Sequence, residues 1–385
     1  MHPAKYLIVG SGFSGCVLAN QLQKNMDCTI DIWDERSHIG GNCYTERDSE
    51  TGIMVHKYGP HIFNTDKKDI WDFVNTFIEL RPYVHRVKAM SKGTIYSLPV
   101  NLQTINAFFK KQFTPFEAKL FIEKLADMSI EFPMNFEEQA LRFIGRELYD
   151  AFFYGYTKKQ WGCEPKFLPA SLLKRIPVRF NYDDNYHTNI FTGIPLNGYA
   201  ELCEKLTTTP RINLFLNRKY SRGVLSEIYD HTFYTGPIDA YFEYKFGRLG
   251  YRTVTFDSFI TTGDYQGTTQ INYCDENVPF TRITEHKHFT PWETHLKSIV
   301  FKEFSKETSP SDIPYYPKRL AIDKQLLDQY RAYASTQTGI SFLGRLATYR
   351  YMDMQHVIRE AIDFAKNFSH ACKHHQPLPV FPNVE

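Results

Sequence analysis

Residues 1–45 combine two short apolar runs with one segment of helical spacing. Residues 6–9 form an uninterrupted apolar run, residues 29–33 form a second, mostly apolar run directly before Asp34, and Val17, Leu18 and Leu22 lie between them. Runs of this length predict buried strands, and the segment between them predicts the crossover helix of a β–α–β unit. The chain therefore opens in the manner of an α/β protein with a parallel sheet.

Helical spacing returns twice before residue 160. Apolar positions 70, 73, 74 and 77 predict a helix whose start can be capped by Thr65. A longer helical block is expected over 102–157. Inside it, Thr114-Pro-Phe-Glu and Asn135-Phe-Glu-Glu both place a capping side chain three residues before an acid, which is typical of a helix start.

The remaining segments favour strands until the last helix. Residues 86–100 have the pattern of a hairpin, and about 177–300 contains short aromatic and β-branched runs broken by Gly, Pro and Asp-Asn. Such runs predict mostly antiparallel strands. Residues 340–345 predict a further strand, and Asp353 starts a helix with positions 358, 361, 362, 365 and 368 on one apolar face. We interpret this strand and this helix as further elements of the first domain, to which the chain returns.

The expected fold class is therefore α/β, with a discontinuous Rossmann-like domain that carries two insertions. We expect the dinucleotide-binding domain at 1–82, about 195–240 and 317–385. The insertions would be a helical bundle at about 102–165 and an antiparallel sheet domain for substrate at about 83–101, 175–194 and 241–316.

The turn after the first apolar run carries the motif Gly10-x-Gly12-x-x-Gly15. Gly10 permits a tight turn, Gly12 lets backbone N–H groups approach a pyrophosphate, and Gly15 lets the helix pack closely on the strand. The helix N-terminus adds a positive dipole end for the anion. Asp34 follows the second run, at about the spacing expected for a carboxylate on the ribose hydroxyls. These features together predict a dinucleotide site.

The residues after Asp34 indicate which dinucleotide binds. Glu35-Arg-Ser-His-Ile-Gly-Gly41-Asn42 follows directly, and residues 9–41 resemble the extended FAD fingerprint of the amine oxidase and glutathione reductase class. An NAD-binding fold with an ordinary Gly-Gly loop is the alternative. Because no second Gly-x-Gly-x-x-Gly occurs later, we expect no separate nicotinamide domain. A flavin here would belong to an oxidase, take electrons transiently, or serve without net redox.

Composition excludes several other classes of function. The 385 residues include 45 basic and 43 acidic side chains, a net charge of +2, so no strong field for nucleic acid or a membrane surface exists. No window approaches the roughly 18 apolar residues of a membrane span. The seven cysteines form no Cys-x-x-Cys pair, which favours reduced thiols in a cytoplasmic protein and predicts no metal site.

Six later segments carry a more specific pattern. They are His56-Lys-Tyr-Gly-Pro-His-Ile-Phe, Phe152-Phe-Tyr-Gly-Tyr-Thr-Lys-Lys-Gln-Trp-Gly, Lys174-Arg-Ile-Pro-Val-Arg-Phe-Asn-Tyr-Asp-Asp-Asn-Tyr, Pro279-Phe-Thr-Arg-Ile-Thr-Glu-His-Lys, Tyr315-Tyr-Pro and Gly344-Arg-Leu-Ala-Thr-Tyr-Arg-Tyr-Met-Asp. With the glycine motif they resemble the bacterial UDP-galactopyranose mutases in order, from about residue 5 to 370.

The resemblance implies an unusual use of FAD. These enzymes interconvert UDP-galactopyranose and UDP-galactofuranose, and they require reduced flavin although nothing is oxidised overall. The flavin N5 attacks the anomeric carbon, UDP leaves, and the N5–sugar adduct lets the ring open and reclose before UDP returns. A cofactor that serves as a nucleophile splits one difficult displacement into easier steps.

The resemblance assigns roles to the charged residues. Arg175 and Arg282 correspond to the two arginines that clamp the pyrophosphate, and Arg175 lies in the loop that closes over substrate. Two guanidinium forks can bind two phosphates and stabilise the charge that grows on the leaving group. His61 corresponds to the histidine beside the flavin ring near N5, and Arg345 to the arginine on the FAD pyrophosphate. For any one arginine, a solvated surface cation is the alternative.

Aromatic residues complete the implied substrate site. Phe152 and Tyr156 lie four apart, share a face if the helix continues, and correspond to the pair that packs on uracil. Asn272 is a further candidate on the base. Trp161 corresponds to the ring beside the sugar. The phosphate-contacting hydroxyls would be Tyr186, Tyr316 and Tyr351. Core packing is the alternative for each ring, most of all for Phe152.

The resemblance also implies which residues bind the cofactor. The helix opened by Asp353 should direct its positive end toward the flavin N1/C2 region and stabilise the anionic reduced form. The full set expected to bind the cofactor is Gly10, Ser11, Gly12, Phe13, Ser14, Gly15, Asp34, Glu35, Gly41, Asn42, His61, Arg345, Met352, Asp353 and Met354.

Three positions depart from the pattern of this family. Asn64 stands where histidine is common, His85 where asparagine is usual, and His187 where phenylalanine is usual. Neutral drift with an unchanged substrate is one interpretation. The other is a changed sugar, because sites that bind a substrate hydroxyl discriminate strongly against analogues that lack it. A 6-deoxy or dTDP-linked substrate, as in a dTDP-fucopyranose mutase, therefore stays open, and His85 and His187 join the expected substrate-binding set.

The expected function is an isomerase of cell-surface glycan synthesis that acts on UDP-galactopyranose. It would use FAD reduced by an external donor such as NAD(P)H, form a homodimer, and bind no nucleic acid. Two rivals remain at this point. A flavin oxidase of the amine oxidase class would share the glycine fingerprint without needing Arg175 and Arg282, and a non-catalytic flavoprotein would only bind nucleotide sugars.

Overall fold

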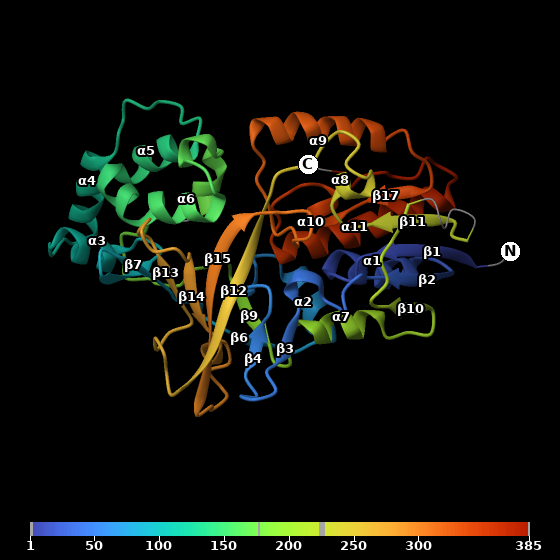
Figure 1. Ribbon diagram of the computed structural model, residues 1–385, viewed down its shortest axis with the longest axis horizontal. Helices are drawn as coiled ribbons and strands as arrows, with labels where there is room; N and C mark the ends of the chain where they lie inside the picture. The colour runs from blue at the N-terminus through green and yellow to red at the C-terminus, as the bar shows by residue number, and fades with distance from the viewer. Residues whose placement is uncertain (1–2, 176–177, 223–227, 384–385) are drawn as a thin grey trace.

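The structure is a computed structural model that describes residues 3–175, 178–222 and 228–383, without the side chains of Lys174 and Arg175. In Figure 1 a parallel sheet and its helices form one side of the molecule, a bundle of shorter helices forms the other, and two long strands run between them.

The first apolar run is the central strand of a five-stranded parallel sheet. The order is β10–β2–β1–β11–β17. The strands are β1 (Ala4–Val9), β2 (Cys28–Trp33), β10 (Ile212–Phe215), β11 (His231–Tyr234) and β17 (Ile340–Phe342). Leu7 and Ile8 are fully buried, as expected for a strand covered on both faces. The Rossmann-like α/β fold predicted from the sequence is confirmed.

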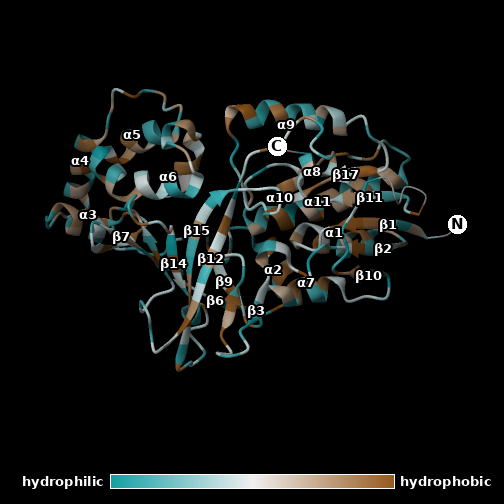
Figure 2. Ribbon diagram, in the orientation of Figure 1, coloured by the Kyte–Doolittle hydropathy of each residue, from teal (hydrophilic) through white to brown (hydrophobic). Residues whose placement is uncertain are grey.

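Helices far apart in the sequence cover this sheet. One core cluster joins β1 and β2 to α1 (Phe13–Asn25), α2 (Lys68–Phe77), α7 (Tyr199–Thr207) and α11 (Met354–Lys373). A second cluster joins β11 and β17 to α8 (Ile238–Tyr241), α9 (Ala321–Ala334) and α10 (Gly344–Ala347). In Figure 2 strand β1 is strongly hydrophobic, whereas α9 is mixed and carries hydrophilic residues on its outer face.

The helical block contains α3 (Leu102–Phe109), α4 (Pro115–Leu125), α5 (Phe136–Leu148) and α6 (Gly155–Trp161). The expected caps are present, because Thr114 and Asn135 accept from the backbone N–H groups of Glu117 and Glu138. Between α5 and α6 the chain forms a π-helix, Tyr149–Tyr154. Two 3-10 turns follow, Pro165–Phe167 and Ala170–Arg175.

A seven-stranded sheet lies between the two sides, in the order β16–β12–β15–β14–β13–β7–β8. Its strands are β7 (Val87–Ser91), β8 (Thr94–Leu98), β12 (Tyr251–Thr262), β13 (Gln270–Tyr273), β14 (Arg282–Glu285), β15 (Lys297–Glu307) and β16 (Tyr316–Pro317). All neighbours are antiparallel except β13 and β7. The register pairs Arg282 with Asn272 on one side and with Glu303 on the other.

Two small sheets complete the fold. Strand β3 (Thr45–Arg47) pairs with β4 (Met54–His56), and β9 (Phe191–Pro195) lies between β5 (Phe63–Thr65) and β6 (Leu80–Pro82). Short 3-10 turns occur at Gly41–Cys43 and His286–Phe289. Phe242, which precedes β12, stacks on Tyr330 of α9 and belongs to the core cluster of β11 and β17. The proposed division into three domains stays a prediction.

None of the helices in the described ranges is both long and apolar enough to cross a bilayer.

Candidate active site

One cavity of about 1510 Å³ extends from the glycine turn to the seven-stranded sheet. It opens beyond the carboxyl end of β1, which lies between β2 and β11, and ligands of parallel α/β sheets bind where the connections diverge in this way. Its walls come from the loop after β2, the 3-10 turn at Gly41, the α6 helix, the β13–β14 hairpin, and the segment 308–316.

The glycine turn exposes bare backbone to this cavity. Gly10 has φ +107°, and a Cβ there would lie 2.1 Å from Thr235 Oγ1. A Cβ on Gly15 would lie 2.0 Å from the Gly10 carbonyl oxygen, so the start of α1 fits against the strand only as glycine. Gly12 and Gly41 face each other, since a Cβ on Gly41 would be 3.1 Å from Gly12 Cα. Both glycine runs therefore form one wall.

The carboxylate of Asp34 is fixed by this turn. Its Oδ2 accepts from the Ser11 backbone N–H at 2.7 Å and from Ser11 Oγ at 2.8 Å, and its Oδ1 accepts from the Arg36 backbone N–H at 2.9 Å. Asp34 and Glu35 line the cavity, whereas Ser11 and Gly15 do not. Ser11 is fully buried and supports the turn from behind.

Cationic and dipolar groups gather at the same end. The first residues of α1 and α11 both line the cavity, and helix N-termini attract anions. Arg36 donates from Nη2 to Asn42 Oδ1 at 2.8 Å and lies over the Tyr58 ring at 4.7 Å, and its buried Nη1 has no partner among the described residues. Bare backbone, two helix N-termini and an unpaired guanidinium nitrogen fit a dinucleotide.

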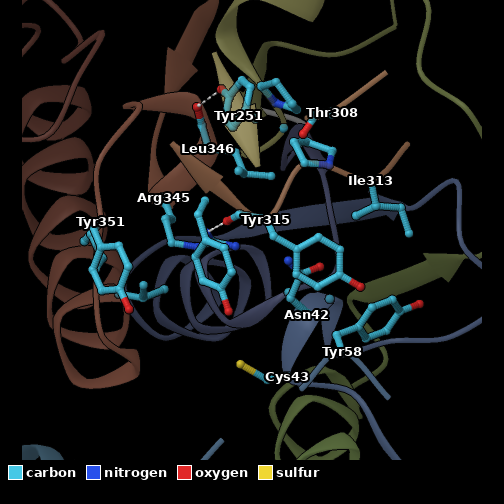
Figure 3. Close-up of a pocket in the computed structure, with 18 of the residues that line it drawn as sticks. Asn42, Cys43, Tyr58, Tyr251, Thr308, Ile313, Tyr315, Arg345, Leu346 and Tyr351 are labelled. Atoms are coloured by element: carbon cyan, nitrogen blue, oxygen red, sulfur yellow. Dashed lines mark hydrogen bonds between the residues drawn. The ribbon is translucent and has the colours of Figure 1, made fainter. Parts of the chain in front are cut away.

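Arg345 lies farther along the cavity. Its Nη1 donates to the Tyr315 carbonyl, and in Figure 3 both side chains lie between Tyr351 and Tyr58. Met352, Asp353 and Met354 line the cavity next to it. This placement suits a group that meets the middle of an extended cofactor.

His61 is a neutral imidazole at the junction of the two halves. Its Nδ1 lies 2.8 Å from the Gly59 carbonyl oxygen, which can only accept, so Nδ1 carries the proton and Nε2 is left as an acceptor. Burial lowers the pKa of His61 to about 4, and Arg345 and Arg282 act in the same direction. At neutral pH the ring is therefore uncharged.

Arg282 is oriented by a carboxylate that the sequence analysis did not single out. Its Nε donates to Glu303 Oε2 at 2.7 Å, and the Glu303 side chain is 2% exposed. Thr281 Oγ1 donates to the other oxygen, Oε1, at 3.0 Å. Burial alone would lower the pKa of Arg282, but the Glu303 carboxylate raises it well above its ordinary value. The guanidinium thus stays charged on the cavity wall.

Aromatic rings line the wall around Arg282. The Tyr316 ring stacks on the Tyr351 ring with a 14° interplanar angle, and its centroid lies 6.4 Å from the ring centroid of Trp161. Burial raises the pKa of Tyr316 to about 12, so its hydroxyl is a neutral donor at pH 7. Tyr156 also lines the cavity. Phe152 is 3% exposed and packs edge-on against Tyr96, yet it reaches the cavity from the π-helix, an element frequent at functional sites.

His85 and His187 form a stacked pair of imidazoles, 5.9 Å between ring centroids at a 25° interplanar angle. Burial lowers the pKa of His85 to about 3 and that of His187 to about 4, so both are neutral. His85 Nδ1 and His187 Nε2 are buried and find no partner in the part of the chain that the structure describes. Both residues line the cavity, and each carries one buried ring nitrogen without such a partner.

The structure brings nearly all of the expected site residues to this cavity. Those lining it are Gly10, Gly12, Phe13, Ser14, Asp34, Glu35, Gly41, Asn42, His61, His85, Phe152, Tyr156, Trp161, Tyr186, His187, Asn272, Arg282, Tyr316, Arg345, Tyr351, Met352, Asp353 and Met354. Ser11 and Gly15 support the turn instead. Arg175 ends a 3-10 turn, and its side chain lies outside the described residues.

Sequence reasoning missed several charged residues that line or support the site, among them Glu303 and Arg36. Glu303 could not be found, because nothing in the sequence shows which residue of β15 pairs with Arg282. Arg36 lies inside the FAD fingerprint, directly after Asp34-Glu35, and that position was the available signal.

Comparison with known proteins identifies the family. A sequence profile described as UDP-galactopyranose mutase matches residues 151–351, and one described as an NAD(P)-binding Rossmann-like domain matches residues 8–77. The chain is 52% identical to a dTDP-fucopyranose mutase of Escherichia coli, over 94% of this chain and 97% of that one. It is 51% identical to a probable UDP-galactopyranose mutase of Klebsiella pneumoniae, over 99% of both chains.

A solved structure shares the fold. A crystal structure of reduced UDP-galactopyranose mutase superposes with a TM-score of 0.74 over 96% of both chains at 15% sequence identity. That likeness supports the architecture, and the full-length curated relatives and the profile support the assignment. The chain therefore belongs to the UDP-galactopyranose mutase family, whose members are isomerases.

Proposed function

We propose that the protein interconverts the pyranose and furanose forms of UDP-linked galactose, with reduced FAD bound along the glycine turn. One observation carries the proposal: a single cavity joins the dinucleotide wall at Gly12 and Gly41 to a pocket of aromatic rings around Arg282. A nucleotide sugar in that pocket would lie beside the inner end of the cofactor.

Reduced flavin would supply an electron-rich nucleophile for the anomeric carbon without net redox. The chain's own contribution is to hold the cofactor. Gly10, Gly12 and the start of α1 would bind its pyrophosphate, Asp34 its ribose, and Arg345 the middle of the molecule. The N-terminus of α11 would favour negative charge on the reduced ring.

The leaving group would be stabilised by Arg282 and by Arg175. Glu303 fixes the Nε edge of Arg282, which directs the remaining guanidinium N–H groups to other partners, and a fixed fork matches phosphate geometry. The role of Arg175 rests on its position in the sequence. Tyr316 and Tyr351 would donate hydroxyls to the same phosphates, and Tyr156 and Phe152 would hold the base.

His61 would act as a neutral acceptor next to the reacting carbon. Its depressed pKa makes it a poor proton donor at pH 7, so we propose that its Nε2 receives a hydrogen bond from the sugar or the flavin rather than delivering a proton as an acid.

The choice of sugar would depend on His85 and His187. Their unpaired buried nitrogens suit a fully hydroxylated hexose, because a substrate without the matching hydroxyl would leave them unsatisfied. A dTDP-linked 6-deoxy hexose is the second candidate, supported by the 52% identity to a dTDP-fucopyranose mutase.

A substrate panel tests this proposal. Reduced protein is incubated with UDP-galactofuranose, UDP-galactopyranose and dTDP-fucopyranose, and products are separated by chromatography. We expect the highest kcat/KM with the UDP-galactose pair, and His187→Ala should lower that kcat/KM by about tenfold or more, the effect of one lost hydrogen bond in a buried site. Higher kcat/KM with dTDP-fucopyranose would establish the second candidate instead.

Three further proposals concern the setting of the enzyme. NAD(P)H would reduce the flavin, which anaerobic bleaching of flavin absorbance by NADH or NADPH would test. The seven free cysteines support a reducing, cytoplasmic location.

A homodimer is supported by strongly exposed apolar side chains on the helical side, including Phe116, Met128, Phe132 and Met134. Light scattering would test it, and Phe132→Ser with Met134→Ser should yield monomers.

A further inference from the structure

Lys159 connects helix α6 to the β13–β14 hairpin, two elements that line the cavity, although Lys159 itself does not line it. It lies on α6, where Tyr156, Gln160 and Trp161 line the site. Its Nζ leaves the helix on another face and lies within hydrogen-bond distance of four backbone carbonyl oxygens in the β13–β14 hairpin. These belong to Tyr273 (2.8 Å), Asp275 (2.8 Å), Val278 (3.0 Å) and Phe280 (3.1 Å).

The hairpin held in this way carries two of the expected substrate-binding residues. Asn272 directly precedes the Tyr273 carbonyl, and Arg282 follows Phe280 by two positions. Asn272 and Arg282 are register partners across the hairpin, and both line the cavity. The four carbonyls therefore span the turn from one of these residues to the other.

A second contact shows how closely the helix meets the hairpin. A Cβ on Gly155, one helical turn before Lys159, would lie 2.3 Å from the Cys274 carbonyl oxygen. Glycine at 155 thus permits the backbones to approach, and the ammonium at 159 adds hydrogen bonds to the turn, where the Asp275 carbonyl also accepts from the Val278 N–H at 3.3 Å. An ammonium has three N–H donors, so the four carbonyls share them.

From these contacts we infer that Lys159 is a positioning residue, which sets the spacing between the aromatic wall of α6 and the Asn272–Arg282 wall and thereby the affinity for the nucleotide of the substrate. The inference rests on the proposed function, because it assigns the nucleotide to the space between these walls. The charge should matter as well as the chain length, since a neutral amine keeps only two N–H donors.

The protonation state of Lys159 gives the inference a signature of its own. Burial lowers the pKa of Lys159 to about 8, while the neighbouring Cys274, Asp275 and Glu276 act in the opposite direction. Above that pH the Lys159 side chain loses one N–H donor and its positive charge. The affinity for the nucleotide should therefore weaken as the pH rises from 7 to 9, and a variant without the amine should lack that step.

The test measures nucleotide binding by the FAD-loaded, oxidised protein, so that catalysis is not needed. UDP and dTDP are titrated by calorimetry, and the one that binds the wild type more tightly is used with Lys159→Met and with Lys119→Met as the matched control. Lys119 is an exposed residue of α4, and its Nζ pairs with Glu123 of the same helix.

We expect Kd to rise about tenfold or more in Lys159→Met at pH 7, as for the loss of a charged, partly buried hydrogen-bonding group. Lys119→Met should keep the wild-type Kd and the weakening above pH 8. Equal Kd values in both variants would overturn the inference, and so would a wild-type Kd that is flat between pH 7 and 9. If Lys159→Met fails to fold, the pH dependence of the wild-type Kd still tests the inference. A wild type that binds neither nucleotide would overturn the proposed function and the inference with it.

Discussion

The Nε of Arg282 and the Oε2 of Glu303 lie 2.7 Å apart across neighbouring strands, and the carboxylate side chain is 2% exposed. This pair places a fixed cation on the wall of a large cavity. Because Glu303 occupies one edge of the guanidinium, the rest of the fork is free to bind a ligand.

Removal of one charge from this pair should be costly. Glu303→Gln leaves the Arg282 cation, whose side chain is 16% exposed, without its counter-ion. We expect the free energy of unfolding to fall by about 3 kcal/mol, as measured for broken buried pairs. Urea unfolding by circular dichroism measures it. Asp72→Asn, which removes an exposed partner of Lys68, is the control and should change little. An equal change in both variants would show that the Arg282 pair is an ordinary surface contact.

The glycines of the first turn should separate folding from cofactor binding. A Cβ on Gly15 would meet the Gly10 carbonyl at 2.0 Å, whereas a Cβ on Gly12 has only Gly41 Cα nearby, at 3.7 Å. Gly12→Ala should therefore leave the apoprotein's Tm nearly unchanged but deplete bound FAD, because the methyl group occupies the cavity. Gly15→Ala should lower the apoprotein's Tm as well.

Flavin absorbance per protein and the apoprotein Tm measure the two effects. Gly93→Ala, at φ +77° with nothing within 4 Å, strains a distant turn and serves as the control with full FAD content. If Gly12→Ala purified with wild-type amounts of FAD, the glycine wall would not be the cofactor site.

Buried neutral histidines should make the fold sensitive to mild acid. Burial lowers the pKa values of His61, His187 and His286 to about 4 and that of His85 to about 3, against 6.5 in the unfolded chain. Below pH 6.5 the unfolded state binds protons that the native state does not. The free energy of unfolding should therefore decrease as the pH falls from 6.5 toward 4.

Urea titrations at pH 7.5, 6.5 and 5.5 would show this slope before most carboxylates titrate. His85→Gln should flatten the slope, whatever its effect on absolute stability, because one such group is gone. His374→Gln, at an exposed position, should keep it. A wild-type unfolding free energy that is constant from pH 7.5 to 5.5 would contradict the assignment of these rings as neutral and buried.

The sequence predicted the β–α–β opening because its glycine spacing and apolar runs act locally. The helix starts at Thr114 and Asn135 were equally readable, since a cap and its N3 acid lie within one turn. Non-local pairings were not readable. The Arg282–Glu303 pair and the Lys159 clamp depend on strand register and on how α6 docks, and these are set by packing across the whole chain.

If the enzyme uses FAD without net redox, the stoichiometry between product and reductant must show it. Under anaerobic conditions, FAD-loaded protein is given a limiting amount of dithionite and excess UDP-galactofuranose, and UDP-galactopyranose is quantified by chromatography. We expect many molecules of pyranose product per molecule of reductant. No pyranose product, or product limited to one molecule per molecule of reductant, would show that the flavin is not used catalytically without net redox.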